Sequence, residues 1–212
     1  MRIGIFGGTF NPPHRGHRHI AEDFCAQMAV SGRPLDKMLI IPTFVPPHKE
    51  SPDLASGEDR LAMCRLAFPG ERFEVSDLEV SRGDRSYTWL TLEDLHEMYD
   101  MPDAPAELYF VMGDDMLLYL PHWARPEKIL EDAVLVSTIR SNDCTVDELQ
   151  AFARANYPEQ YAKNRFLFFE SDPFPVSSTQ VRELIKAKNE TELKRLLDPE
   201  VLAYVLERRL YQ

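Results

Sequence analysis

Two histidines near the amino terminus have a spacing that suits phosphate chemistry. They lie in the segment Gly7-Gly8-Thr9-Phe10-Asn11-Pro12-Pro13-His14-Arg15-Gly16-His17. His14 and His17 are three residues apart, so on a helix that begins here both imidazoles share one face. Gly16 removes side-chain bulk between them, and a helix start offers N–H donors and partial positive charge to an anion. The segment therefore predicts a phosphate-binding site at a helix start.

The common phosphate-binding loops do not match this segment. No Gly-Lys-Ser/Thr follows the glycines, so it is not a Walker A loop, and the Gly-x-Gly-x-x-Gly dinucleotide fingerprint is absent. Gly7-Gly8 predicts a sharp turn after a short strand, with main-chain N–H groups close to a ligand. A metal site on His14, His17 and His19 is the alternative. It is disfavoured because His19 leaves the shared face and no carboxylate or thiol stands close in sequence.

The elements that must position these histidines alternate between strand and helix. Hydrophobic periodicity predicts strands over 2–6, 38–41, 73–80, 108–112, 133–139 and 166–169. It predicts helices over 16–30, 58–68, 88–99, 146–155, 178–187, 190–197 and 199–210. Such alternation indicates an α/β protein with a doubly wound, Rossmann-like parallel sheet, helices on both faces and a C-terminal helical segment. We expect one domain over 1–212, with the sheet core to about 176 and C-terminal helices from about 177.

Ligands of open parallel sheets bind at the carboxyl ends of the strands. Gly113 and Asp115 follow the strand 108–112 at that edge, and Asp114 between them is expected to be solvated. The loop 42–57 is long for a compact α/β unit, which predicts that it is functional or mobile. Two helix starts are also predicted, a capping box from Thr145 to Glu148 and an N-cap at Asp198 before a proline.

Composition excludes several classes of protein. The 212 residues contain 24 Lys+Arg and 35 Asp+Glu, a formal net charge of −11 that disfavours nucleic-acid binding. No run of about 18 apolar residues predicts a membrane span, and the start of the chain does not resemble a secretory signal. Cys25, Cys64 and Cys144 are odd in number and far apart, which favours a reducing cytoplasm. The sequence leaves a homo-oligomer possible.

Two signatures together resemble one superfamily. The segment from Gly7 to His17 resembles the first signature of the HxGH nucleotidyltransferases, and Val176-Ser177-Ser178-Thr179-Gln180-Val181-Arg182 is similar to their second, Ile-Ser-Ser-Thr-x-Ile-Arg. One branch, the bacterial nicotinate-nucleotide adenylyltransferases, is also similar in its middle motifs and in its ending at 205–211. Those middle motifs are Pro46-Pro47-His48-Lys49, Ser86-Tyr87-Thr88, Gly113-Asp114-Asp115 and Trp123.

The resemblance implies an activity. It implies a single nucleotidyltransferase domain that transfers the adenylyl group of ATP to nicotinate mononucleotide by in-line attack without a covalent intermediate. The products are nicotinate adenine dinucleotide and pyrophosphate, in a step of NAD biosynthesis. Magnesium would arrive on the ATP phosphates, with no metal ligand from the protein. The implied partners are therefore small molecules.

The resemblance also assigns roles to residues. The catalytic residues would be His14, His17 and Arg182. The ATP-binding residues would be Gly7, Gly8, Thr9, Phe10, His14, His17, Gly113, Asp115, Ser178, Thr179 and Arg182. The acceptor-binding residues would be Asn11, Lys49, Tyr87, Thr88, Asp115 and Trp123, with Trp123 stacking on the pyridine ring and the helix start at Thr88 receiving its carboxylate. Arg140 is a weaker candidate for ATP.

Departures from the pattern leave alternatives open. Asn11 stands where many relatives carry Asp, Val176 replaces Ile, and Ala124 follows Trp123 where some relatives have an aromatic residue; the stretch 141–147 matches no motif. The rivals are a transferase that uses nicotinamide mononucleotide or phosphopantetheine, a non-catalytic nucleotide-binding relative, and an NAD(P)-binding oxidoreductase. The missing dinucleotide fingerprint disfavours the last, and the retention of both histidines and Arg182 disfavours the non-catalytic relative.

Overall fold

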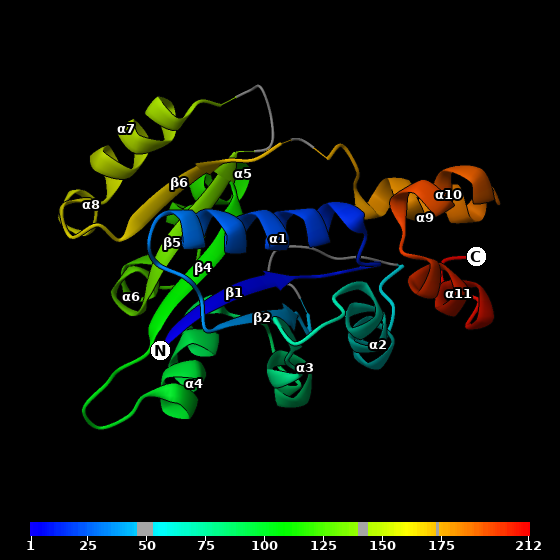
Figure 1. Cartoon of the computed structure of the whole chain (residues 1–212), viewed down its shortest axis with the longest axis horizontal. Helices are drawn as coiled ribbons and strands as arrows, with labels where there is room; N and C mark the ends of the chain where they lie inside the picture. The colour runs from blue at the N-terminus through cyan, green and yellow to red at the C-terminus, as the bar shows by residue number, and fades with distance from the viewer. Residues whose placement is uncertain (46–52, 140–143, 173) are drawn as a thin grey trace. The chain divides into compact units, whose positions relative to one another are not determined.

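A parallel sheet is the frame of the molecule (Figure 1). The computed structural model describes residues 1–45, 53–139, 144–172 and 174–212. Within them the sheet has six strands in the order β3-β2-β1-β4-β5-β6. The strands are β1 (Arg2–Gly8), β2 (Lys37–Pro42), β3 (Phe73–Val75), β4 (Glu107–Gly113), β5 (Ala133–Ile139) and β6 (Phe166–Glu170). The order reverses between β1 and β4, as expected for a doubly wound sheet.

Helices lie on both sides of the sheet, which confirms the predicted α/β class. Those before β5 are α1 (Arg15–Val30), α2 (Gly57–Ala67), α3 (Leu78–Arg82), α4 (Thr88–Tyr99), α5 (Asp114–Leu118), the 3-10 turn η1 (Leu120–His122) and α6 (Pro126–Asp132). Those after it are α7 (Val146–Asn156), α8 (Pro158–Ala162), α9 (Ser178–Lys186), α10 (Glu190–Leu196) and α11 (Pro199–Glu207).

The chain divides into two compact units. The first unit comprises Met1–Gly7, Glu22–Met38 and Tyr87–Pro173, and the second comprises Gly8–Ala21, Leu39–Ser86 and Phe174–Gln212. Each of β1, α1 and β2 begins in one unit and ends in the other. A single domain over 1–212 stays a prediction.

The first unit is built on β4 and its neighbours. From Leu108 to Met112 every residue of β4 is buried, because a central parallel strand is covered on both faces. Gly4 of β1 lies opposite Tyr109 of β4. A Cβ at Gly4 would come within 2.5 Å of the sulfur of Met38 and 2.9 Å of the ring of Phe24, so only glycine fits there.

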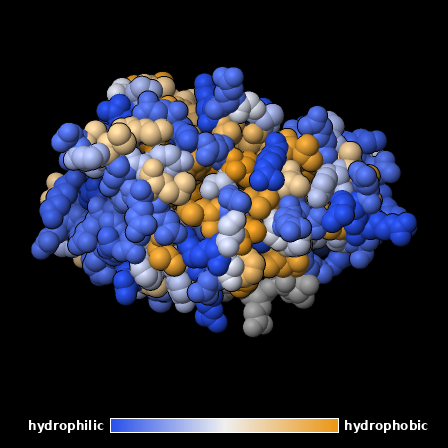
Figure 2. Space-filling view, turned by 90° about the horizontal axis from the view of Figure 1, so that it is seen from below, coloured by the Kyte–Doolittle hydropathy of each residue, from blue (hydrophilic) through white to orange (hydrophobic). Residues whose placement is uncertain are grey.

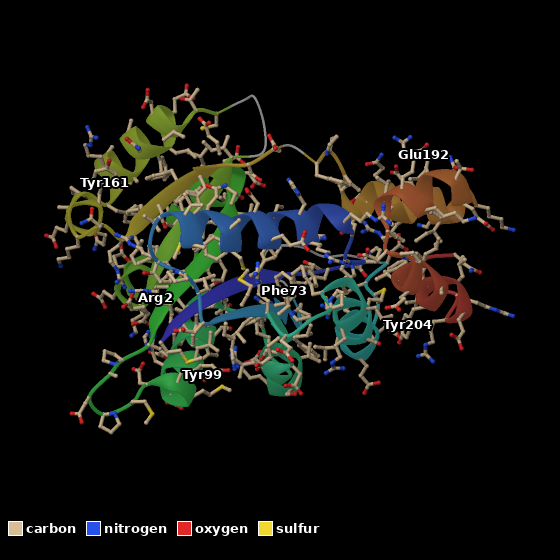
Figure 3. The ribbon with its side chains drawn as sticks, viewed as in Figure 1. Arg2, Phe73, Tyr99, Tyr161, Glu192 and Tyr204 are labelled. Carbon is tan, nitrogen blue, oxygen red and sulfur yellow. The ribbon has the colours of Figure 1, made fainter. Side chains whose placement is uncertain are left out.

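The second unit joins α2 to α11 through one carboxylate. Asp59 of α2 accepts hydrogen bonds from Tyr204 (2.9 Å) and Arg208 (3.2 Å) of α11, and Figure 3 labels Tyr204. Its other oxygen accepts from the hydroxyl of Ser56 (2.7 Å), the N-cap of α2. The C-terminal helix is therefore docked by a polar network as well as by its buried Val201, Leu202 and Val205.

Most local predictions are confirmed, and one strand is shorter than predicted. The Thr145–Glu148 capping box is present, and the helix at 88–99 and the strand at 133–139 have the predicted bounds. The strand predicted over 73–80 ends at Val75, because Asp77 begins α3 and Gly83, with φ of 70°, ends it. Asp198 occupies the N-cap position of α11 without a capping bond, since its carboxylate instead faces the guanidiniums of Arg15 (3.8 Å) and Arg18 (3.9 Å).

The surface is mixed in character. Figure 2 shows hydrophilic residues over much of one face and hydrophobic residues gathered near its middle.

None of the described helices is long and apolar enough to cross a membrane.

Candidate active site

The first signature differs from its predicted form at the two glycines. Gly7 and Gly8 are the last residues of β1 and do not form the predicted sharp turn. The left-handed backbone falls instead on Phe10, with φ of 47°. Gly8 serves close packing, because a Cβ there would lie 3.1 Å from the ring of Phe10. The buried Phe10 ring stands edge-on to His17 (5.0 Å) and to Phe68 (6.0 Å), so it packs directly against the histidine ring.

His14 and His17 cap the start of α1 reciprocally. The main-chain N–H of His17 donates to Nδ1 of His14 (3.3 Å), and the main-chain N–H of His14 donates to Nδ1 of His17 (3.2 Å). The two rings stack with centroids 3.7 Å apart at 24°. Because each Nδ1 accepts a hydrogen bond, the proton of each neutral ring is on Nε2. The predicted pairing of the imidazoles is therefore present, and both rings have the same tautomer.

Gly16 brings the two signatures into contact. A Cβ at this position would lie 2.7 Å from Cγ1 of Val176 and 3.1 Å from Nδ1 of His14. Because glycine has no side chain, Val176 and His14 can pack closely here, whereas we expected the space at Gly16 to serve the approach of a ligand.

The second signature begins α9 beside the first. Ser177 caps this helix by accepting from the N–H of Gln180 (3.1 Å), and the hydroxyl of Ser178 donates to the carbonyl of Pro12 (2.9 Å). Arg182 donates to the carbonyl of Asn11 (2.9 Å) and to the hydroxyl of Thr179 (3.2 Å). The starts of α1 and α9, which lie more than 160 residues apart in the sequence, therefore lie together. We call this region, which contains Arg182 and the positive ends of both helices, the cationic corner.

Asn11 has structural partners for its side chain. Its Oδ1 accepts from the hydroxyl of Tyr211 (2.7 Å) and the N–H of Ala55 (3.0 Å), and its Nδ2 donates to the carbonyl of Asp53 (2.9 Å). The residue is only 3% exposed. The same environment raises the pKa of Tyr211, because its hydroxyl is buried. The amide predicted to bind the acceptor thus holds together the first-signature loop, the segment before α2 and the end of the chain.

Arg60 was not foreseen from the sequence. Its guanidinium, at 1% exposure, donates to the main-chain carbonyls of Thr9, Thr43, Phe44 and Ala55. The available signal was its position in α2, four residues before Cys64 and seven before Ala67, which places a charge on the buried face.

The remaining described candidates belong to the first unit. Gly113 ends β4, and Asp115 in the first turn of α5 is exposed. The expectation that Asp114 is solvated is wrong, because this first residue of α5 is buried at 7% exposure.

The aromatic candidate Trp123 is half-buried and stands edge-on to Phe110, with centroids 6.2 Å apart at 88°. Thr88 is the first residue of α4, and Tyr87 at the N-cap makes no side-chain capping bond. Arg125, two residues after Trp123, holds its guanidinium 4.1 Å above the ring of Trp89, the residue after Thr88. This cation–π contact joins the Trp123 segment to the start of α4.

Other predicted contacts lie outside the described residues. These are Lys49, with the rest of its motif at 46–48, and Arg140. Within the described part of the chain, no three His, Cys, Asp or Glu side chains are grouped to hold a metal ion.

Comparisons with known proteins place the chain among nucleotidyltransferases. A family model described as cytidylyltransferase-like matches residues 5–184. The "Probable nicotinate-nucleotide adenylyltransferase" of Bacillus licheniformis is 34% identical over 212 residues, covering 100% of this chain and 98% of the relative. The protein of the same name from Geobacillus kaustophilus is 33% identical over 211 residues, covering 99% and 86%.

A solved structure supports the fold. The Plasmodium falciparum nicotinic acid mononucleotide adenylyltransferase complexed with NaAD superposes with a TM-score of 0.73 at 17% identity, covering 99% of this chain and 97% of that one.

Proposed function

The chain belongs to the cytidylyltransferase-like family and, within it, to the nicotinate-nucleotide adenylyltransferases, and on this basis we propose that it makes nicotinate adenine dinucleotide from ATP and nicotinate mononucleotide. The phosphate oxygen of the mononucleotide attacks the α-phosphorus of ATP, the bond to the β-phosphate oxygen breaks, and pyrophosphate leaves. No covalent enzyme intermediate is needed. The reaction is a step of NAD biosynthesis.

The observation that carries this proposal is the reciprocal cap of His14 and His17. Phosphoryl-type transfer needs positioned donors where negative charge grows, because there is little covalent chemistry for the protein to do. Each ring is fixed through Nδ1 and keeps its proton on Nε2, so each neutral imidazole can donate to a phosphate oxygen without acting as a base.

Residues of both signatures would bind the ATP phosphates. Arg182 and the start of α9 at Ser178 and Thr179 would hold the β- and γ-phosphates, since a guanidinium and helix N–H groups both suit anions. Gly7, Gly8, Thr9 and Phe10 would contribute main-chain atoms, because the Phe10 side chain is buried. In the first unit, Gly113 and Asp115 would contact the nucleoside, with the exposed carboxylate suited to ribose hydroxyls.

The acceptor would meet residues of the first unit and Lys49. Trp123 offers a ring for stacking, and the start of α4 at Tyr87 and Thr88 offers N–H donors to the pyridine carboxylate. Asp115 and Lys49 would reach the ribose and the phosphate. Asn11 would act through the loop that it fixes, because its amide is already hydrogen-bonded.

Magnesium fits this scheme as part of the ATP substrate. The donors at the two helix starts are imidazole, guanidinium, hydroxyl and N–H groups, which suit phosphate oxygens. Magnesium prefers oxygen ligands and keeps its waters, so we propose that the ATP phosphates carry it. A cytoplasmic location and the oligomeric state stay predictions.

Pyrophosphate release tests the proposal directly. The purified protein is given MgATP with nicotinate mononucleotide, nicotinamide mononucleotide or phosphopantetheine, and a reaction without acceptor is the control. We expect nicotinate mononucleotide to give the highest kcat/KM. A higher value with either other acceptor would replace the assigned substrate, and no release with any acceptor would favour a non-catalytic relative.

A further inference from the structure

A fully buried arginine holds three chain segments together in the second unit. Nη1 of Arg60 donates to the carbonyl of Thr9 (3.0 Å) and also to that of Thr43. Nη2 donates to the carbonyl of Phe44 (3.1 Å), and Nε to that of Ala55 (3.1 Å). These four bonds to described residues all end on main-chain oxygens.

The stability of the fold does not by itself explain such a residue. Burying a charge is costly, and buried ion pairs can often be replaced as a whole by apolar residues of similar volume without loss of stability. Burial lowers the pKa of this guanidinium, although arginine remains protonated in proteins. The groups that act on it electrostatically are Cys64, Tyr211 and the buried Glu79 of α3. A role in holding particular atoms is therefore the better explanation.

Arg60 joins the first signature, which is assigned to ATP, to the residues on either side of the segment that contains the acceptor candidate Lys49. Thr9 lies in the first signature, five residues before His14. Phe44 and Ala55 lie on either side of the motif that contains Lys49. Further bonds link the same segments: Thr43 donates to the carbonyl of Gly8 (2.9 Å), and Ala55 donates to Asn11 (3.0 Å).

We propose that Arg60 is a positioning residue for adenylyl transfer, which fixes the first signature relative to the chain at 43–44 and at 55. This inference rests on the proposed function. Arg60 does not touch the substrates itself. It acts by setting the distance between the loop that holds ATP and the segments that lead to the acceptor's phosphate ligand, so its loss should affect alignment more than binding.

Arg60→Gln and Arg60→Lys test this role. A misplacement of about 1 Å can cost about 10² in rate, so we expect kcat to fall by about that factor in Arg60→Gln. The dissociation constants of ATP and of nicotinate mononucleotide, each measured alone by calorimetry, should change far less. Arg60→Lys keeps the charge but lacks the planar fork, so it should not restore kcat.

Arg165 provides the matched control. Its guanidinium also donates to two main-chain carbonyls, those of Leu130 (2.6 Å) and Glu131, and burial also lowers its pKa. It directly precedes β6, at the amino end of that strand, and neither of these two partners is a candidate site residue. Arg165→Gln should lower the melting temperature and leave kcat unchanged.

The outcomes separate this inference from the proposed function. An unmodified protein without turnover would overturn both. Wild-type kcat in a folded Arg60→Gln, restoration of kcat by lysine, or equal losses in kcat and in both affinities would overturn the inference alone. If circular dichroism shows that neither variant folds, Arg60 serves folding and the inference is also overturned.

Discussion

His14 and His17 each use one ring nitrogen, Nδ1, to cap the start of α1. Their Nδ1 atoms accept from the main chain at the start of α1, which orients both rings and fixes the proton on Nε2. At the scale of single residues, the signature therefore combines a helix cap with a pair of oriented donors. Substitution of either histidine should change both the free energy of unfolding and kcat, and the two changes can be measured separately.

His17→Ala should lower kcat by about 10²–10³, the cost of one lost donor to developing charge. It should also lower the free energy of unfolding by about 0.5–2 kcal/mol, because a helix cap is lost. Steady-state kinetics and urea melts measure the two effects. His17→Asn is the control, since its side chain can still accept from a main-chain N–H. Wild-type kcat in a folded His17→Ala would exclude a catalytic role.

Arg182→Ala should raise the KM for ATP more than the KM for nicotinate mononucleotide. Its guanidinium is held by the carbonyl of Asn11 and the hydroxyl of Thr179 at the cationic corner. Arg182→Lys should recover only part of the loss, because lysine lacks the planar fork. Initial rates with each substrate varied in turn provide the measurement. An effect confined to the acceptor would place Arg182 in the wrong half of the site.

The start of α4 is the element that should distinguish an acid from an amide. Thr88 is its first residue, and the helix end favours a carboxylate over a carboxamide, whose NH₂ would be poorly paired. We expect nicotinate mononucleotide to be preferred by about 1–3 kcal/mol in kcat/KM terms, the scale of one unmatched polar group.

Thr88→Pro should narrow that preference, because proline removes the N–H while suiting the first position of a helix. Trp123→Ala should weaken the binding of both mononucleotides equally and serves as the control. Competition between the two mononucleotides gives the ratio directly. A ratio near one in the unmodified protein would indicate dual specificity.

The junction of α2 and α11 should make stability depend on acid pH. Burial raises the pKa of Asp59, but hydrogen bonds from Ser56, Tyr204 and Arg208 outweigh it and hold that pKa below its ordinary value. A carboxyl with a lower pKa in the folded state contributes stability above its unfolded pKa of about 3.9. That contribution is lost as the pH falls through the folded pKa.

Asp59→Asn should therefore flatten the fall in the free energy of unfolding below about pH 4. Urea melts across the acid range measure this slope. Tyr204→Phe removes one of the bonds and should give an intermediate slope. An unchanged slope in Asp59→Asn would assign the acid sensitivity to other carboxylates.

At the scale of the whole molecule, the negative net charge of the protein repels the proposed substrates. The formal net charge is −11, while ATP and nicotinate mononucleotide are anions. Raising the ionic strength from about 0.01 to 0.15 M shortens the screening length from about 30 to about 8 Å. The association rate of ATP, measured by stopped flow, should therefore rise severalfold, while that of uncharged adenosine stays constant. A steady fall would show that the cationic corner dominates at long range.

Local patterns in the sequence determine much of this protein. Some elements depend on residues within a few positions of one another, so they can be predicted from the sequence. These include the Thr145–Glu148 capping box, the helix at 88–99 and the strand at 133–139. The alternation of strand and helix predicts the sheet, because right-handed crossovers leave few other topologies. The spacing of the paired histidines likewise predicts two imidazoles on one face, and the structure shows that these rings stack.

Only the tertiary structure decided which distant groups meet. Tyr211 donates to Asn11 across 200 residues, and Arg60 joins three segments through main-chain carbonyls, which carry no signal in residue type. Gly16 makes room for Val176, and Asp198, at its predicted N-cap position, faces two arginines and makes no capping bond. A polar side chain that becomes buried must find a hydrogen-bond partner. Which of several possible partners lies close enough depends on the packed fold and not on the neighbouring residues in the sequence.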